Sequence, residues 1–314
     1  MARKIILDVE PGITDVLTLY YALFDPEFNV LGITVCGGTN SLPTALRCVQ
    51  RILDAIQPAQ MPRLGVGMGY LPMPMGDLEE FHSSSFFSAM EFPDADYFSV
   101  QPACRIIKEL IRENPHEITL LTLGPLTNPA RVFSSHPDLA ELLHRMIITG
   151  GSVLEPGNAT LAAEYNFYRD PKAAEWIMRT PVARTLLPLD VTNQILLDYD
   201  ILQLLPQTDS VSARFLNQAV NRLLQLHREI LGIEGIYVSG MLALEALLHP
   251  NLFSGKMMHG EVETEGEKTR GMTIFDRRLH PKFSPDLEVM LSVDSIEVLR
   301  NIYRFLERLT ELST

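Results

Sequence analysis

The chain has 314 residues, the length of one large α/β domain or of two smaller domains. Apolar residues make up 46% of it and charged residues 21%, which excludes a disordered chain, a fibrous chain and a coiled coil. With 39 acidic and 26 basic side chains the formal net charge is −13, which argues against non-specific nucleic-acid binding and docking on anionic membranes, because both need a basic surface.

Short apolar runs alternate with longer helical patterns along most of the chain. We expect strands over 4–9, 28–35, 64–66, 118–123, 145–148 and 183–187, and helices over 14–24, 42–56, 101–114 and 171–180. After residue 194 the pattern changes to helices over 211–231, 240–248 and 295–312, with strands near 259–264 and 287–293. This alternation predicts one α/β domain over residues 1–314, with an open, mostly parallel central sheet and helices on both faces.

The cysteine content and the length of the apolar runs indicate the cellular compartment in which we expect the protein. The cysteines Cys36, Cys48 and Cys104 are an odd and sparse set, so we expect buried thiols rather than a disulfide framework. The first apolar run is too short for a signal peptide, and no run approaches the roughly 20 residues of a membrane-spanning helix. We therefore expect a cytoplasmic protein.

Carboxylates gather where the first expected strand ends. Asp8, Glu10 and Asp15 lie within eight residues at a strand-to-helix turn, and ligands of parallel α/β sheets bind at the carboxyl ends of strands. Such oxygen ligands suit Ca²⁺ or Mg²⁺. Alternatively, Asp8 caps the turn and Asp15 complements the positive end of the helix.

Seven segments, in order, resemble the inosine-uridine preferring nucleoside hydrolase family. The segment Asp8-Val-Glu-Pro-Gly-Ile-Thr-Asp15 resembles the family's Asp-x-Asp-Pro-Gly-x-Asp-Asp opening, and 163–166 resemble its Ala-Glu-Phe-Asn. Gly157–Asn158 and Asp170–Pro171 belong to the same block as 163–166, and the other five matching segments are Ile33–Asn40, Leu123–Asn128, Thr149–Gly151, Leu189–Thr192 and Thr269–Thr273. The resemblance implies a nucleoside hydrolase-like fold with a Rossmann-like core. It also implies calcium-dependent hydrolysis of the N-glycosidic bond of ribonucleosides to ribose and free base, in purine and pyrimidine salvage by a homodimer or homotetramer.

The resemblance also assigns roles to residues. It implies that Glu10 binds the metal and acts as base toward water, that Asp15 is a further catalytic acid and metal ligand, and that the carbonyl of Leu123 completes one side of the metal. The residues expected to bind substrate, mainly at the ribose, are Thr14, Thr39, Asn40, Asn158, Glu164 and Asn166, with His82 facing the site from the irregular segment 67–100.

Several positions depart from the family pattern. Glu10 is one methylene longer than the family's aspartate, Thr14 replaces an aspartate, and Thr39 replaces an asparagine that Asn40 could supply if the turn shifts by one residue. Ser239 and Gly240 stand where the family has a histidine, a candidate acid for the leaving base, and an aspartate that binds metal.

These departures leave two main hypotheses open. The chain is either a hydrolase of nucleosides with altered metal use, or a non-catalytic member that binds a ribosyl or nucleoside ligand. A purely structural or partner-binding protein is a third and weaker alternative.

Overall fold

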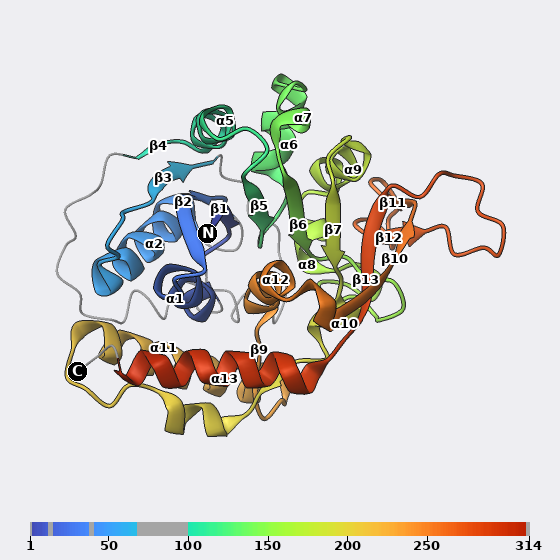
Figure 1. The fold of residues 1–314 in the computed structure, drawn as a ribbon. Helices are drawn as coiled ribbons and strands as arrows, with labels where there is room; N and C mark the ends of the chain where they lie inside the picture. The colour runs from blue at the N-terminus through green and yellow to red at the C-terminus, as the bar shows by residue number, and fades with distance from the viewer. Residues whose placement is uncertain (1, 12–14, 38–40, 68–99, 312–314) are drawn as a thin grey trace.

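The computed structural model describes residues 2–11, 15–37, 41–67 and 100–311. These residues contain a nine-stranded sheet in the order β10-β13-β7-β6-β5-β1-β2-β3-β4 (Figure 1). Neighbouring strands are parallel throughout, except that β10 is antiparallel to β13. The strands are β1 (Arg3–Val9), β2 (Phe28–Val35), β3 (Arg63–Val66), β4 (Gln101–Pro102), β5 (Thr119–Thr122), β6 (Arg145–Thr149), β7 (Arg184–Leu187), β10 (Phe253–Met258) and β13 (Leu287–Val293).

Helices cover both faces of the sheet, which confirms the predicted fold class. One face carries α1 (Asp15–Phe24), α2 (Leu42–Ile56), α11 (Val211–Leu226), α12 (Ser239–Leu248) and α13 (Ser295–Glu311). The other carries α5 (Ala103–Glu113), α6 (Thr127–Ser135), α7 (Leu139–Leu142) and α9 (Pro171–Arg179). Each group of helices packs its buried side chains into a separate hydrophobic cluster against the strands.

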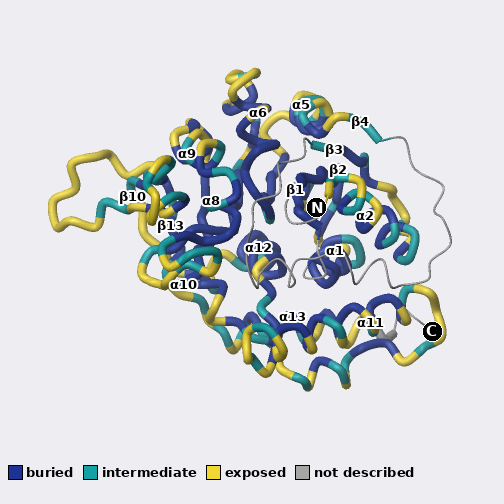
Figure 2. Tube along the Cα trace, turned by 180° about the vertical axis from the view of Figure 1, so that it is seen from behind, coloured by how far each residue is buried: buried dark blue, intermediate teal, exposed yellow. Residues whose placement is uncertain are grey.

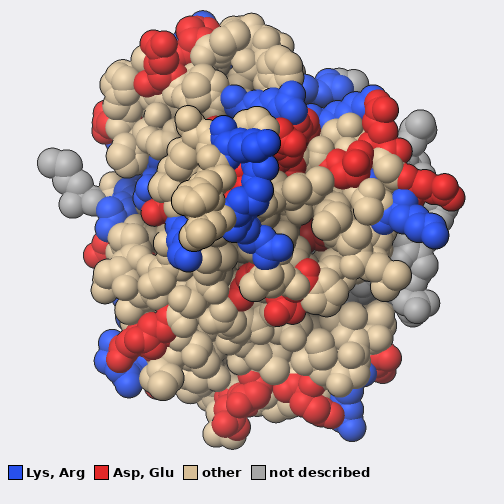
Figure 3. Space-filling model, turned by 90° about the vertical axis from the view of Figure 1, so that its right-hand side faces the viewer, with Lys and Arg blue, Asp and Glu red and all other residues tan. Residues whose placement is uncertain are grey.

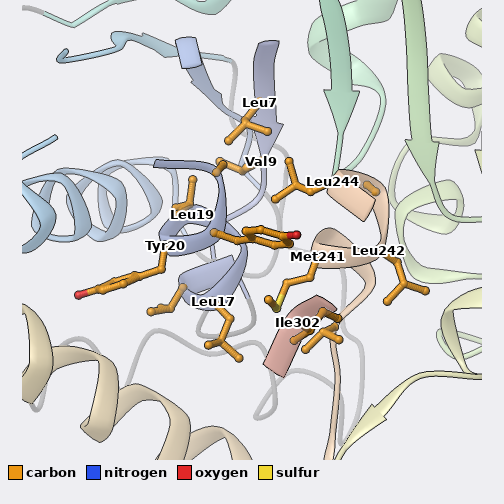
Figure 4. Packing of buried hydrophobic residues seen from close by; sticks show 14 of the residues in the cluster. Leu7, Val9, Leu17, Leu19, Tyr20, Met241, Leu242, Leu244 and Ile302 are labelled. Carbon is orange, nitrogen blue, oxygen red and sulfur yellow. The ribbon is translucent and has the colours of Figure 1, made fainter. Parts of the chain in front are cut away.

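The central strand β1 shows why its sequence is a continuous apolar run. Successive side chains of a strand point to opposite faces, so Leu7 and Val9 join one cluster while Ile6 joins the other. Figure 4 shows Leu7 and Val9 between Leu19 of α1 and Leu244 of α12. Strand β1 and helix α12 are buried along most of their length (Figure 2). The carboxyl end of β1 is therefore held rigidly between two helical layers.

Shorter elements lie around the sheet. They are α8 (Tyr165–Arg169), α10 (Leu189–Thr192), the 3-10 helices at Tyr199–Leu204 and Pro250–Leu252, and the two small antiparallel pairs β8 (Leu196–Leu197) with β9 (Ile236–Tyr237) and β11 (Gly260–Val262) with β12 (Thr273–Phe275). No helix in the described ranges is long and apolar enough to cross a membrane.

The structure differs from the expected elements most clearly at two places. The helix expected over 211–231 changes at Leu226 into a π-helical turn, His227–Leu231, which ends at Gly232 with a φ of 66°. The edge strand β10 had no expected counterpart, because four of its six residues are exposed and it shows no apolar alternation.

Charge is distributed unevenly over the surface. Figure 3 views the side of the molecule that carries β10, β11 and β12, and a band of Lys and Arg side chains crosses it between acidic groups. In this part of the chain Arg184 pairs with Asp286 and Arg278 pairs with Asp276. The net charge of −13 therefore does not mean a uniformly acidic surface.

Candidate active site

A cavity of about 380 Å³ opens at the carboxyl ends of β1, β5 and β6. Six of the residues singled out by the sequence line it together, namely Glu10, Asp15, Leu123, Asn158, Glu164 and Asn166. The other four, Thr14, Thr39, Asn40 and His82, lie outside the described residues. The structure thus brings together, in one cavity, side chains from three separate parts of the chain.

Asp8 lies behind the cavity rather than in its wall. Its carboxylate is fully buried and accepts hydrogen bonds from Thr34 Oγ1 at 2.5 Å and Asn128 Nδ2 at 2.9 Å. Burial raises the pKa of the Asp8 carboxyl from 3.8 to about 7, against the lowering effect of these two hydrogen bonds. Because Thr34 belongs to β2 and Asn128 to α6, Asp8 ties together β1, β2 and α6 behind the cavity.

Glu10 follows β1 directly and is itself buried. The hydroxyl of Tyr165 donates a hydrogen bond of 2.5 Å to Glu10 Oε1, and both residues line the cavity. A short bond to a carboxylate is charge-assisted and stronger than a bond between neutral groups. Tyr165 therefore fixes the direction of the carboxylate that the resemblance assigns as the base.

The expected ribose-binding residues are held by backbone groups. Asn158 Oδ1 accepts from the N–H of Tyr165 at 2.8 Å. Asn166 Nδ2 donates to the carbonyl of Thr149 at 3.1 Å and to that of Leu123 at 3.4 Å. Each amide group thus has one end bound to the protein, which fixes the side chain before any ligand arrives.

Glu164 caps the short helix α8 and is 6% exposed. Its Oε2 accepts from the N–H groups of Gly151 at 3.0 Å and Phe167 at 3.2 Å. Burial raises the pKa of the Glu164 carboxyl to about 7, and these backbone hydrogen bonds oppose the rise. Gly150 makes the close approach possible, since its φ is 137° and a Cβ there would lie 2.7 Å from Glu164 Oε2.

The wall at the start of α12 carries no charge. Ser239 and Gly240 line the cavity at the places where the resemblance implies a histidine and an aspartate. A Cβ on Gly240 would lie 2.4 Å from Oγ1 and 2.8 Å from Cγ2 of Thr18, a buried residue of α1. Thr18 thus occupies the space that a side chain at position 240 would need.

These contacts allow the implied calcium site to be tested. Glu10 Oε1 accepts from Tyr165, the Leu123 carbonyl accepts from Asn166, and Gly240 supplies no ligand. Among the described residues no group of three His, Cys, Asp or Glu side chains could hold a metal ion. Since Ca²⁺ takes six to eight oxygen ligands, the described donor set does not fit calcium.

Sequence reasoning singled out no individual residue in one part of the cavity wall. His227, in the π-helical turn, lines the cavity with Leu231, Ile233 and Tyr237. The imidazole Nδ1 lies 3.0 Å from the Leu223 carbonyl, and Nε2 accepts from the N–H of Tyr237 at 3.4 Å. Burial lowers the pKa of His227, which favours the neutral ring that these two hydrogen bonds hold in the wall. Nothing in a helical pattern through 211–231 marks it as a site residue.

Comparison with known proteins identifies the family. A family model described as inosine-uridine preferring nucleoside hydrolase matches residues 5–300. The pyrimidine-specific ribonucleoside hydrolase RihA of Escherichia coli (strain K12) is 29% identical over 296 residues, covering 94% of this chain and 95% of that protein. RihA of Citrobacter koseri is 28% identical over the same shares.

Solved structures match the whole fold. The plant nucleoside hydrolase PpNRh1 aligns with a TM-score of 0.86 and 26% identity, over 98% of this chain and 99% of that one. A purine-preferring ribonucleoside hydrolase from Gardnerella vaginalis aligns with a TM-score of 0.87, over 99% and 100% of the two chains, and at 24% identity it supports the fold alone.

Proposed function

The chain belongs to the inosine-uridine preferring nucleoside hydrolase family and is a hydrolase of ribonucleosides, and we propose that the cavity at the carboxyl ends of β1, β5 and β6 carries out this reaction. The observation that carries the proposal is the set Asn158, Glu164 and Asn166, fixed by backbone hydrogen bonds beside Glu10. The substrate is a small nucleoside, and the products are ribose and free base.

The hydrogen bonds that the expected ribose-binding side chains make within the protein determine which of their donors and acceptors remain for the sugar. Asn158 uses its carbonyl oxygen on Tyr165, which leaves its NH₂ to donate to a ribose oxygen. Asn166 uses its NH₂ on backbone carbonyls, which leaves its carbonyl oxygen to accept. Glu164 uses Oε2 on backbone N–H groups, which leaves Oε1 to accept from a second hydroxyl. One donor and two acceptors suit the vicinal hydroxyls of ribose.

The chemical step follows from the carboxylates. Glu10 takes a proton from water while the water oxygen bonds to C1′ and the bond between C1′ and the base nitrogen breaks. That nitrogen takes up a proton from solvent and Glu10 releases its proton to solvent, so one water molecule is consumed overall. The sugar passes through an oxocarbenium-like transition state, and Glu10, Asp15 and Glu164 stabilise its positive charge because they line the same cavity.

Calcium is the cofactor that the family resemblance implies, with Glu10, Asp15 and the Leu123 carbonyl as its ligands. The described donor set does not fit it, because Glu10 Oε1 accepts from Tyr165, the Leu123 carbonyl accepts from Asn166, and Gly240 brings no carboxylate, with Thr18 in the space beside it. The proposed step therefore runs on the protein's own side chains.

Other features of the assignment remain proposals. We propose that the base lies against Leu231, Ile233 and Tyr237, which add apolar surface to the wall. We also propose a single domain over residues 1–314, a homodimer or homotetramer, and a cytoplasmic role in purine or pyrimidine salvage.

Base release from nucleosides tests the function. Purified protein is incubated with uridine, cytidine, inosine and adenosine, and free base is measured by chromatography. We expect release from at least one nucleoside, a loss of about 100-fold or more in Glu10→Ala, and no loss in Glu155→Ala, which alters an exposed loop residue. No release from any of the four would overturn the proposal and favour the non-catalytic alternative, for which calorimetry would show nucleoside binding without turnover.

A further inference from the structure

Two side chains that depart from the family pattern contact each other. Glu10 is one methylene longer than the aspartate of the opening motif, and Tyr165 adds a hydroxyl to the phenylalanine of the Ala-Glu-Phe-Asn block. That added hydroxyl donates to the Oε1 of the lengthened carboxylate at 2.5 Å, across 155 residues of sequence. A phenylalanine could not make this bond.

Tyr165 also connects the base to the groups that bind ribose. Its backbone N–H donates to Asn158 Oδ1, and its neighbours in the chain are Glu164 and Asn166. One short segment therefore positions the ribose-binding side chains through its backbone and positions Glu10 through a side chain.

A further departure, at Gly240, removes the competing arrangement. Gly240 provides no carboxylate, and Thr18 fills the space where one would lie. In the described part of the wall, the O–H of Tyr165 donates to Glu10 Oε1, and no group of three His, Cys, Asp or Glu side chains could hold a cation.

We propose that Tyr165 is the positioning residue for Glu10, that its hydroxyl takes the place of a divalent cation beside this carboxylate, and that the site works without a divalent metal ion. The proposal rests on the proposed hydrolysis, in which Glu10 receives the proton of the attacking water. A phenol on one carboxylate oxygen holds the group in a single orientation, which is the geometric condition for general-base catalysis.

The first experiment separates positioning from binding. In Tyr165→Phe we expect kcat to fall by about 10-fold to 100-fold with KM within about 3-fold of wild type, because the ribose-binding side chains are unchanged. Tyr168→Phe is the matched control, since that ring lies on the same short helix but contacts Arg270. An unchanged kcat in Tyr165→Phe, or an equal loss in both variants, would overturn the positioning role.

The second experiment measures metal binding directly, which does not depend on turnover, and adds a comparison of activity. CaCl₂ is titrated calorimetrically into metal-free wild type, and activity is compared before and after treatment with EDTA. We expect no binding heat up to about 1 mM calcium and no loss of activity. Binding below that concentration, or EDTA-sensitive activity restored by calcium, would overturn the proposal. If the protein released no base at all, the hydrolase proposal would fail, but the titration would still show whether the protein binds calcium.

Discussion

Thr18 of α1 fills the space beside Gly240 of α12, so the two residues fit each other as a pair. A Cβ at position 240 would lie 2.4 Å from the threonine Oγ1, well inside van der Waals contact, and Thr18 is buried with no room to withdraw freely. Two helices that are far apart in the sequence meet at this point, in the wall of the cavity.

The pair predicts a coupled effect on stability. Gly240→Ala should lower the free energy of unfolding by about 1–3 kcal/mol through overpacking, even though alanine is the better helix former. Adding Thr18→Ala should recover most of that loss, because it empties the space that the new Cβ needs. Urea unfolding of both single variants and the double variant measures the coupling. A Gly240→Ala protein as stable as wild type would show that the helices move apart easily.

Asn166 should govern affinity for the sugar. Asn166→Ala removes the acceptor proposed for a ribose hydroxyl and leaves the carbonyls of Thr149 and Leu123 without this donor. We expect nucleoside binding to weaken by at least about 10-fold, or ~1.4 kcal/mol, in calorimetric titrations. Asn221→Ala, on an exposed face of α11, should leave affinity unchanged. Equal affinity in Asn166→Ala would remove this residue from the binding site.

Glu164 should impose a pH dependence on activity. Burial raises the pKa of its carboxyl to about 7, and only the ionised form accepts hydrogen bonds through both oxygens. We therefore expect kcat/KM to rise with pH through about 7 and to level off above it. Glu164→Gln should lose about 10-fold or more in kcat/KM at high pH, whereas the exposed Glu155→Gln should keep the wild-type profile. A flat wild-type profile between about pH 5 and 9 would contradict this role.

Asp8 should make stability depend on pH. Its pKa is about 7 in the folded protein and near 3.8 when unfolded, so the folded state holds the proton over a range in which the unfolded chain has lost it. The contribution of Asp8 to the free energy of unfolding is fully present below about pH 4 and is lost as pH rises through about 7. The free energy of unfolding should therefore fall by about 3 kcal/mol between about pH 5 and 8 on account of this group.

Replacing the Asp8 carboxyl should reduce the pH dependence of the free energy of unfolding. Asp8→Asn cannot ionise, so its free energy of unfolding should change less than that of wild type between the same two pH values. Denaturant unfolding at each pH measures the difference, and Asp200→Asn, which removes an exposed carboxylate, is the control. An unchanged slope in Asp8→Asn would mean that Asp8 ionises normally in the folded protein.

Much of the fold was predictable because the signals are local. The strand at 28–35 and the helix at 42–56 were predicted with the bounds that the structure shows, since apolar spacing alone reveals them. The edge strand β10 was missed because its residues are mostly exposed and carry no apolar alternation. The π-helical turn was missed because its spacing still reads as helix.

The sequence by itself determined the family, the parallel α/β architecture and the segments that bear the site, because ordered motifs and apolar periods are properties of neighbouring residues. Only the tertiary structure decided how the departures fit together. The contacts of Tyr165 with Glu10 and of Thr18 with Gly240 join residues more than 150 positions apart. Whether the Tyr165 hydroxyl reaches the Glu10 carboxylate, and whether Thr18 fills the space beside Gly240, depends on how β1, α1, α8 and α12 pack. No local sequence pattern carries that information.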